Sequence, residues 1–105
     1  MKGGHIVSEE RLSFLRLTAD DNVYARPLLL FGFTLLVASS GDYMDLYHGQ
    51  DAGGQKIGRY TSFKEETKPV LFGGGLRLAR GLFVDFEEAD TEATFYFKPL
   101  REGEE

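Results

Sequence analysis

The sequence predicts an all-β protein, an antiparallel β-sandwich of about seven or eight short strands. From Gly41 to Phe97, short runs of alternating apolar and polar residues are separated by turns rich in Gly and Asp, which is the spacing of strands joined by tight connections. That many strands in 105 residues fit two packed sheets, because a single sheet would leave one apolar face in water. Jelly-roll connectivity is one candidate, and no repeat of fixed period is evident.

The amino-terminal part of the chain gives the weakest strand signals. The segment from Ser8 to Thr18 fits either a helix start or a strand, and we favour a strand with a slip, such as a bulge, near Leu15. The segment from Thr18 to Pro27 carries the turn-forming residues Asp20, Asp21 and Asn22 and is expected to be a loop. Leu28 to Val37 is apolar on both faces and predicts a central strand buried from two sides, with a buried helix as the alternative.

The remaining strands follow at short intervals. Tyr43 to His48 alternates, the Gly-rich stretch from Gly49 to Gly54 predicts a hairpin loop, and the return strand begins near Ile57. Further strands are expected around Val70 and Phe72, interrupted by the Gly73 to Gly75 run, at Leu82 to Phe86, and at Ala93 to Lys98.

Length and composition exclude several protein classes. The chain fits a single domain, residues 1–105, with 1–7 expected as a flexible arm and 101–105 as an acidic, solvated tail. The absence of cysteine excludes a disulfide framework and thiolate metal ligation. A net charge of −5 argues against nucleic-acid binding. The longest apolar stretch is too short for a membrane span and no export signal is recognised, so we expect no membrane association.

No catalytic motif accompanies this fold, so we expect no enzyme and no cofactor. His5 and His48 are far apart in sequence and lack a nucleophile pattern, and for His48 a structural role in capping a turn is favoured. Two groups of turn acids lack the spacing of a calcium loop, so solvated acids are favoured and no metal site is predicted. The Gly-rich loops lack the lysine and following helix of a phosphate loop.

Two kinds of binding surface remain open. Tyr43, Tyr47 and Tyr60 are candidates for an aromatic platform that stacks on sugars, although half-buried tyrosines at sheet edges are favoured. The strand from Leu28 to Val37 and the pair Phe95 and Phe97 supply more apolar surface than a thin sandwich hides comfortably, so a homo-oligomer is as well supported as a filled monomer core. The candidate partner-binding residues are Leu28, Leu30, Phe95 and, in the arm, His5, Ile6 and Val7.

The carboxyl-terminal half resembles a group of small virion proteins of tailed bacteriophages. The resemblance lies in DLYHGQDAGGQKIGRY and in KPVLFGGGLRLARGLFVDFEEADTEATFYFKP. Members show an "LYdG" strand end, a "G–L" hairpin, an apolar "p-i/l" strand, an "r/k-GLyv" turn and a final "vtvyy" strand. In this chain the strand end, the apolar strand, the turn and the final strand correspond to Leu46–Gly49, Pro69–Leu71, Arg80–Val84 and Ala93–Phe97. His48 stands where aspartate is more usual, and the chain up to Arg26 matches little.

The resemblance implies a β-sandwich structural component of a phage particle, assembled in the host cytoplasm and located in the virion. A capsid decoration protein would bind the assembled shell as a homo-oligomer, with a trimer favoured and the major capsid or tail protein as partner. A head–tail or tail attachment component is an alternative of the same class. The rival from another class is a carbohydrate-binding or adhesion module, which uses the same kind of sandwich.

Overall fold

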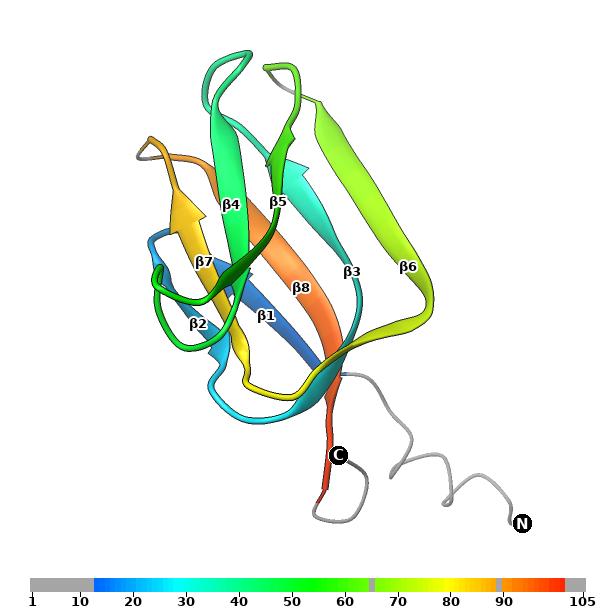
Figure 1. The fold of residues 1–105 in the computed structure, drawn as a ribbon. Coiled ribbons are helices and arrows are strands. Elements are labelled where there is room, and N and C mark those ends of the chain that lie inside the picture. Colours follow the sequence, from blue (N-terminus) through cyan, green and yellow to red (C-terminus); the bar gives the residue numbers. More distant parts are fainter. Residues whose placement is uncertain (1–12, 65, 89, 102–105) are drawn as a thin grey trace, which may run out of the picture.

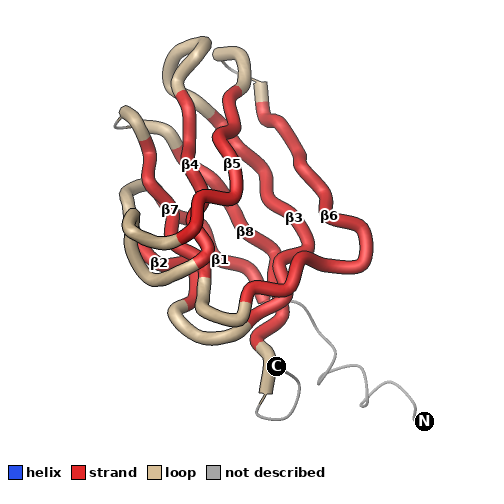
Figure 2. Tube along the Cα trace, in the orientation of Figure 1, coloured by secondary structure: helices blue, strands red, loops and turns tan. Residues whose placement is uncertain are grey.

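The fold is built from eight antiparallel strands, in a computed structural model that describes residues 13–64, 66–88 and 90–101. Figures 1 and 2 show that every regular element in these residues is a strand. The bounds are β1 Ser13–Leu17, β2 Asp21–Tyr24, β3 Leu28–Leu36, β4 Tyr43–His48, β5 Gln55–Thr61, β6 Thr67–Leu78, β7 Leu82–Phe86 and β8 Glu92–Pro99. The expected arm, residues 1–7, and most of the expected tail lie outside the described residues.

The strands form two four-stranded sheets packed face to face, a β-sandwich (Figure 1). The first sheet has the order β1-β8-β3-β6 and the second sheet has the order β2-β7-β4-β5. Four of the antiparallel pairs, β1 with β8, β2 with β7, β3 with β6 and β4 with β5, are those of one long hairpin. The pairs β3 with β8 and β4 with β7 roll this hairpin into two sheets. This is jelly-roll connectivity. The predicted fold class is therefore confirmed.

Alternating apolar residues of both sheets fill the space between them. Phe33 of β3 stands at the centre, with its ring 5.6 Å from Phe95 of β8 in the same sheet and 4.9 Å from Tyr60 of the opposite sheet, edge on. Because apolar burial is the main favourable term in folding, this cluster holds the sheets together. Its other fully buried large apolar members are Leu28, Leu30, Leu35, Met44, Leu46, Leu82 and Val84.

Three expectations for the amino-terminal half need correction. Asp21–Tyr24, expected within a loop, is the edge strand β2, because Val23 is buried and the segment pairs with β7. β1 pairs with β8 in continuous register, so the slip expected near Leu15 is absent. β3 is a central strand as predicted, between β8 and β6, but it is not buried from two sides, because its outward side chains are half-exposed and only Gly32 is buried on the outer face.

The Gly73 to Gly75 run bends β6 without ending it. The register of β6 against β3 shifts between Leu30 and Gly32, and β6 has extra residues opposite this point. Gly73 and Gly75 have positive φ angles of 43° and 105°, which residues with a side chain rarely adopt. The interruption predicted from sequence is therefore a bulge inside one long strand.

The connections gather at two ends of the sandwich. The β3–β4, β5–β6 and β7–β8 loops lie at the upper end in Figure 1, and the β2–β3, β4–β5 and β6–β7 loops lie at the lower end. The structure thus offers two outer sheet faces and two loop ends as possible binding surfaces.

Candidate interaction surfaces

The outer face of the first sheet carries exposed apolar side chains in a cross-strand row. Phe14 of β1 pairs with Tyr96 of β8, Tyr96 pairs with Gly32 of β3, and Gly32 pairs with Leu71 of β6. Directly opposite residues lie on the same side of a sheet, so the row crosses all four strands. We call Phe14, Tyr96, Gly32 and Leu71 the apolar row.

The apolar row is open to solvent. Phe14 is 73% exposed, Leu71 is 80% exposed and Tyr96 is 37% exposed. Gly32 adds no side chain, and a Cβ there would lie 3.0 Å from Cδ2 of Leu71 and 2.5 Å from the carbonyl oxygen of Val70. Only glycine therefore lets β6 and its Leu71 side chain approach β3 this closely.

Beside the row, the same face holds an ion pair between neighbouring strands. The Arg16 guanidinium lies 2.7 Å from the Glu92 carboxylate. A hydrogen bond from Arg16 lowers the pKa of Glu92. Polar side chains next to exposed apolar ones are the usual arrangement at the edge of a protein contact.

The outer face of the second sheet is organised around a buried carboxylate. Asp45 of β4 is 5% exposed and receives hydrogen bonds from two guanidinium nitrogens of Arg59, at 2.8 and 3.0 Å. The Lys56 ammonium lies 3.3 Å from the same carboxylate. Arg59 stacks over Tyr43 at 3.7 Å from the ring centre, and Lys56 lies 6.0 Å from the ring centre of Tyr47. We call these five residues the tyrosine face.

The pKa values of two carboxyl groups, one on the tyrosine face and one beside it, shift in opposite directions. The hydrogen bond from Arg59 lowers the pKa of Asp45 and outweighs the effect of burial, which acts to raise it. Asp85 of β7 lies directly opposite Asp45 in register. Burial, followed by the nearby Asp20 carboxylate, raises the pKa of Asp85. Asp20 also accepts a hydrogen bond from the backbone N–H of Phe86.

The structure separates the three tyrosines of the expected platform. Tyr43 and Tyr47 project from β4 on the same outer face, four residues apart. Tyr60 lies on the other side of the second sheet against Phe33, where burial raises its pKa. One ring face of Tyr43 is covered by Arg59, so less of that aromatic surface is free to stack on a sugar.

The expected partner-binding residues fall in two places. Leu28, Leu30 and Phe95 are fully buried between the sheets, where the protein's own side chains cover them. His5, Ile6 and Val7 lie outside the described residues. A partner that docks on the described part of the chain would therefore meet other side chains.

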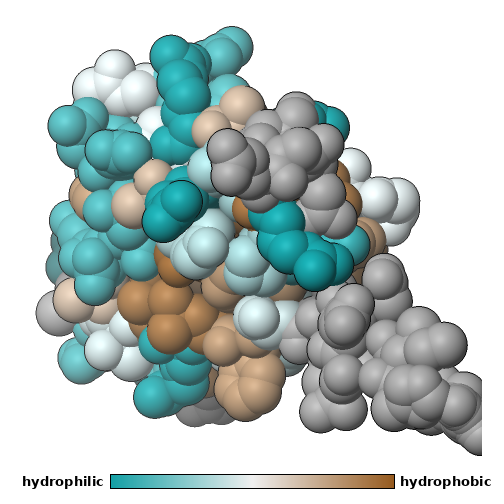
Figure 3. All heavy atoms as spheres, turned by 90° about the horizontal axis from the view of Figure 1, so that it is seen from below, coloured by the Kyte–Doolittle hydropathy of each residue, from teal (hydrophilic) through white to brown (hydrophobic). Residues whose placement is uncertain are grey.

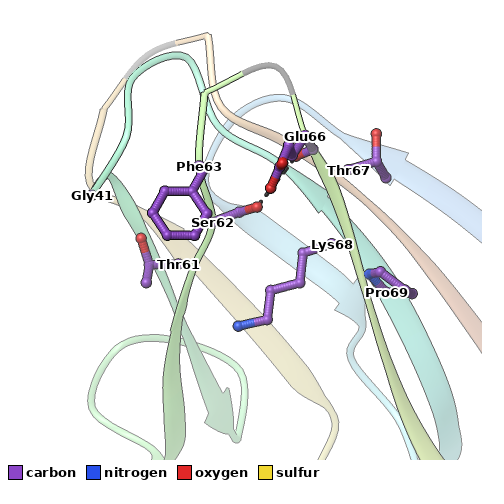
Figure 4. A pocket seen from close by; sticks show the side chains of 8 residues that line it. All are labelled: Gly41, Thr61, Ser62, Phe63, Glu66, Thr67, Lys68 and Pro69. Carbon is purple, nitrogen blue, oxygen red and sulfur yellow. Dashed lines mark hydrogen bonds between the residues drawn. The ribbon is translucent and has the colours of Figure 1, made fainter.

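A cleft opens between the edge strands at the upper end of the sandwich (Figure 4). Its volume is about 550 Å³, and Thr61, Phe63 and Lys68 line it from β5, the following loop and β6. Phe63 is 70% exposed, and the Ser62 hydroxyl donates a hydrogen bond to the Glu66 carbonyl oxygen across the loop. The cleft is where the β5–β6 connection crosses from the second sheet to the first.

His48 ends β4 at the lower end of the sandwich. Its Nε2 accepts a hydrogen bond from the backbone N–H of Arg80, at 3.0 Å. Burial, followed by the charge of Arg80, lowers the pKa of His48. Across residues 13–64, 66–88 and 90–101, no group of three or more His, Asp and Glu side chains is arranged to hold a metal ion.

The chain matches no family model, no curated protein and no solved structure. In the described part of the chain, no helix has the length and apolar character needed to cross a membrane. The resemblance to virion proteins therefore continues to rest on the sequence segments quoted above.

Tyr43 and Tyr47 on the outer face of the second sheet were predicted from the sequence as candidate binding residues. The exposure of Phe14 and Leu71 on the outer face of the first sheet was not predicted. The available signal was that apolar residues occupy both phases of β1, since Leu15 and Leu17 point inward while Phe14 points outward. Asp45 and Arg59 are partners only because β4 and β5 pair in this register.

Proposed function

We propose that this protein is a non-enzymatic structural component that assembles with further copies of itself through the outer face of the first sheet. One observation carries the proposal: two large apolar side chains, Phe14 and Leu71, are each more than two-thirds exposed in one row on that face. Exposed apolar side chains gathered on one face mark surfaces that other proteins cover.

The sequence resemblance supplies the kind of assembly. It supports a virion component of a tailed phage, with capsid decoration as the leading form and head–tail or tail attachment as the alternative. Many weak contacts repeated over a shell add up to strong binding, so a decoration protein that assembles through the apolar row needs only modest contacts with the shell from each copy.

The mode of association follows from symmetry. Two copies that pack the apolar row against itself form a twofold dimer, whereas a closed trimer needs the row to meet a different surface of the next copy. The edge of β6 is a poor site for strand addition, because Pro69 has no N–H to donate and the bulge at Gly73 to Gly75 disturbs the edge. Side chains of the sheet face are therefore the better contact.

The carbohydrate-binding alternative has less support from the structure's side chains. Tyr43 and Tyr47 share one face, but Arg59 stacks on Tyr43 and Tyr60 is turned inward. We therefore propose assembly in preference to glycan binding.

The test is the solution mass of the purified protein, measured by light scattering over a range of concentrations. We expect a discrete oligomer for the wild type and a monomer for the double variant Phe14→Ser, Leu71→Ser. Phe63→Ser is the matched control, since Phe63 is equally exposed but lies at the cleft. A wild-type monomer up to the highest soluble concentration would overturn the proposal, as would an oligomer that the double variant retains.

A further inference from the structure

A second surface, at the lower end of the sandwich, forms a cavity of about 430 Å³ between three loops. Arg26 and Pro27 line it from the β2–β3 loop, Gly49 from the β4–β5 loop, and Arg80 from the β6–β7 loop, with His48 at the end of β4. Figure 3 looks onto this end of the molecule and shows hydrophilic side chains around a group of hydrophobic ones. The cavity is of the size that holds a small organic molecule.

Two arginines without an ion-pair partner in the described part of the chain, Arg26 and Arg80, line the cavity. Arg16 and Arg59 form ion pairs with acidic residues, whereas neither Arg26 nor Arg80 does so within the described residues. Asp51 lies in the adjoining β4–β5 loop but does not line the cavity, and its carboxylate accepts the backbone N–H of Gly53 at 2.8 Å. Two arginines therefore line a cavity that has no acidic residue among the described residues of its wall.

His48 carries a further hydrogen-bond donor. Because Nε2 accepts the Arg80 backbone N–H, the proton of the neutral ring lies on Nδ1, which is then a donor. Gly54 packs directly against the end of β4, since a Cβ there would lie 2.6 Å from the His48 carbonyl oxygen. The side chains of Ala25, Pro27 and Ala79 give the rest of the wall an apolar character.

We infer that this cavity binds a small organic anion, with its phosphate or carboxylate group between Arg26 and Arg80 and its apolar body against the alanine and proline wall. Planar guanidinium groups bind both oxyanions through paired N–H donors. The volume exceeds what a bare oxyanion fills, so the ligand includes a body attached to the anionic group. The inference is independent of the apolar row, which lies on the outer face of the first sheet.

The experiment is a titration of the full chain followed by amide NMR shifts, with four probes: inorganic phosphate, phenyl phosphate, benzoate and neutral phenol. We expect saturable shifts at the amides of Gly49, Gly54 and Arg80. Phenyl phosphate should bind more tightly than inorganic phosphate, and phenol should not bind. The ratio of phenyl phosphate to benzoate affinity identifies which oxyanion the site prefers.

Variants localise the binding. Arg26→Gln and Arg80→Gln should each weaken phenyl phosphate binding by about tenfold or more, as expected for loss of a charge-assisted hydrogen bond. Lys64→Gln removes the same charge at the opposite end and should leave binding unchanged. The inference is overturned if no anion gives saturable shifts at these amides, or if the arginine variants bind as the wild type does.

Discussion

The two outer faces of the sandwich differ in whether their side chains find contact partners within the same chain. On the tyrosine face, Asp45 holds both Arg59 and Lys56, and these cations lie over Tyr43 and Tyr47. On the first sheet, Phe14 and Leu71 extend into solvent. The polar and aromatic side chains of the tyrosine face are thus partnered within one chain, while the apolar side chains of the apolar row would be buried only by a partner.

Removing the centre of the tyrosine face should have the largest effect. Asp45→Ala leaves Arg59 and Lys56 without their shared carboxylate, and we expect the free energy of unfolding to fall by about 1 to 3 kcal/mol. The cations are partly exposed and regain water, which keeps the loss below that of a fully buried pair. Urea unfolding measures it, with Glu88→Ala as the control for loss of one exposed acid. Equal losses of unfolding free energy for the two substitutions would show that the contacts of Asp45 with Arg59 and Lys56 do not stabilise the fold.

The same carboxylate should make the free energy of unfolding depend on pH. Its pKa is lowered in the folded protein, so its contribution is present above the ordinary aspartate pKa and is lost as the pH falls through the lowered value. We expect the stability gap between wild type and Asp45→Asn to be full at pH 7 and to narrow below about pH 4. Thermal unfolding across this range tests it, and a gap that is constant with pH would contradict the role given to Arg59.

Asp85 should show the opposite sign. Its pKa is raised, so ionisation is unfavourable in the folded protein, and the penalty is full above the raised pKa and absent below the ordinary one. Asp85→Asn should therefore stabilise the protein at pH 7 by about 0.2 to 1 kcal/mol, the size of one cross-strand side-chain pair, since like charges directly opposite one another are destabilising. The two proteins should converge near pH 3. Destabilisation at pH 7 would mean that the carboxylate makes a contact the amide cannot replace.

The sandwich fold could be predicted from the sequence, whereas one edge strand and the candidate sites could not. Alternation and glycine turns were sufficient for the sandwich, because inward residues such as Leu82 and Val84 must lie two apart on a strand. β2 was missed because Asp21–Tyr24 is short and begins with turn-forming residues, and its pairing with β7 outweighs that local preference. The sites were less accessible still. Arg26 and Arg80 are 54 positions apart, and only the loop arrangement brings them to one cavity.

The smallest change in intrinsic stability is expected on the open face. Phe14→Ser and Leu71→Ser remove exposed side chains, so each should alter the unfolding free energy of the isolated chain by no more than about 0.5 kcal/mol. Association stabilises the folded chain by an amount that grows with the logarithm of protein concentration, so the wild-type melting temperature should rise with concentration while that of the double variant stays constant.

Melting curves at two concentrations about a hundredfold apart therefore distinguish the faces. Asp45→Ala should lower the melting temperature while keeping its concentration dependence, because the tyrosine face lies on the opposite sheet. A wild-type melting temperature that does not change with concentration would show that no second copy covers the apolar row in solution. The apolar row would then be covered only by a different protein, whose surface must supply the apolar contacts that a second copy does not.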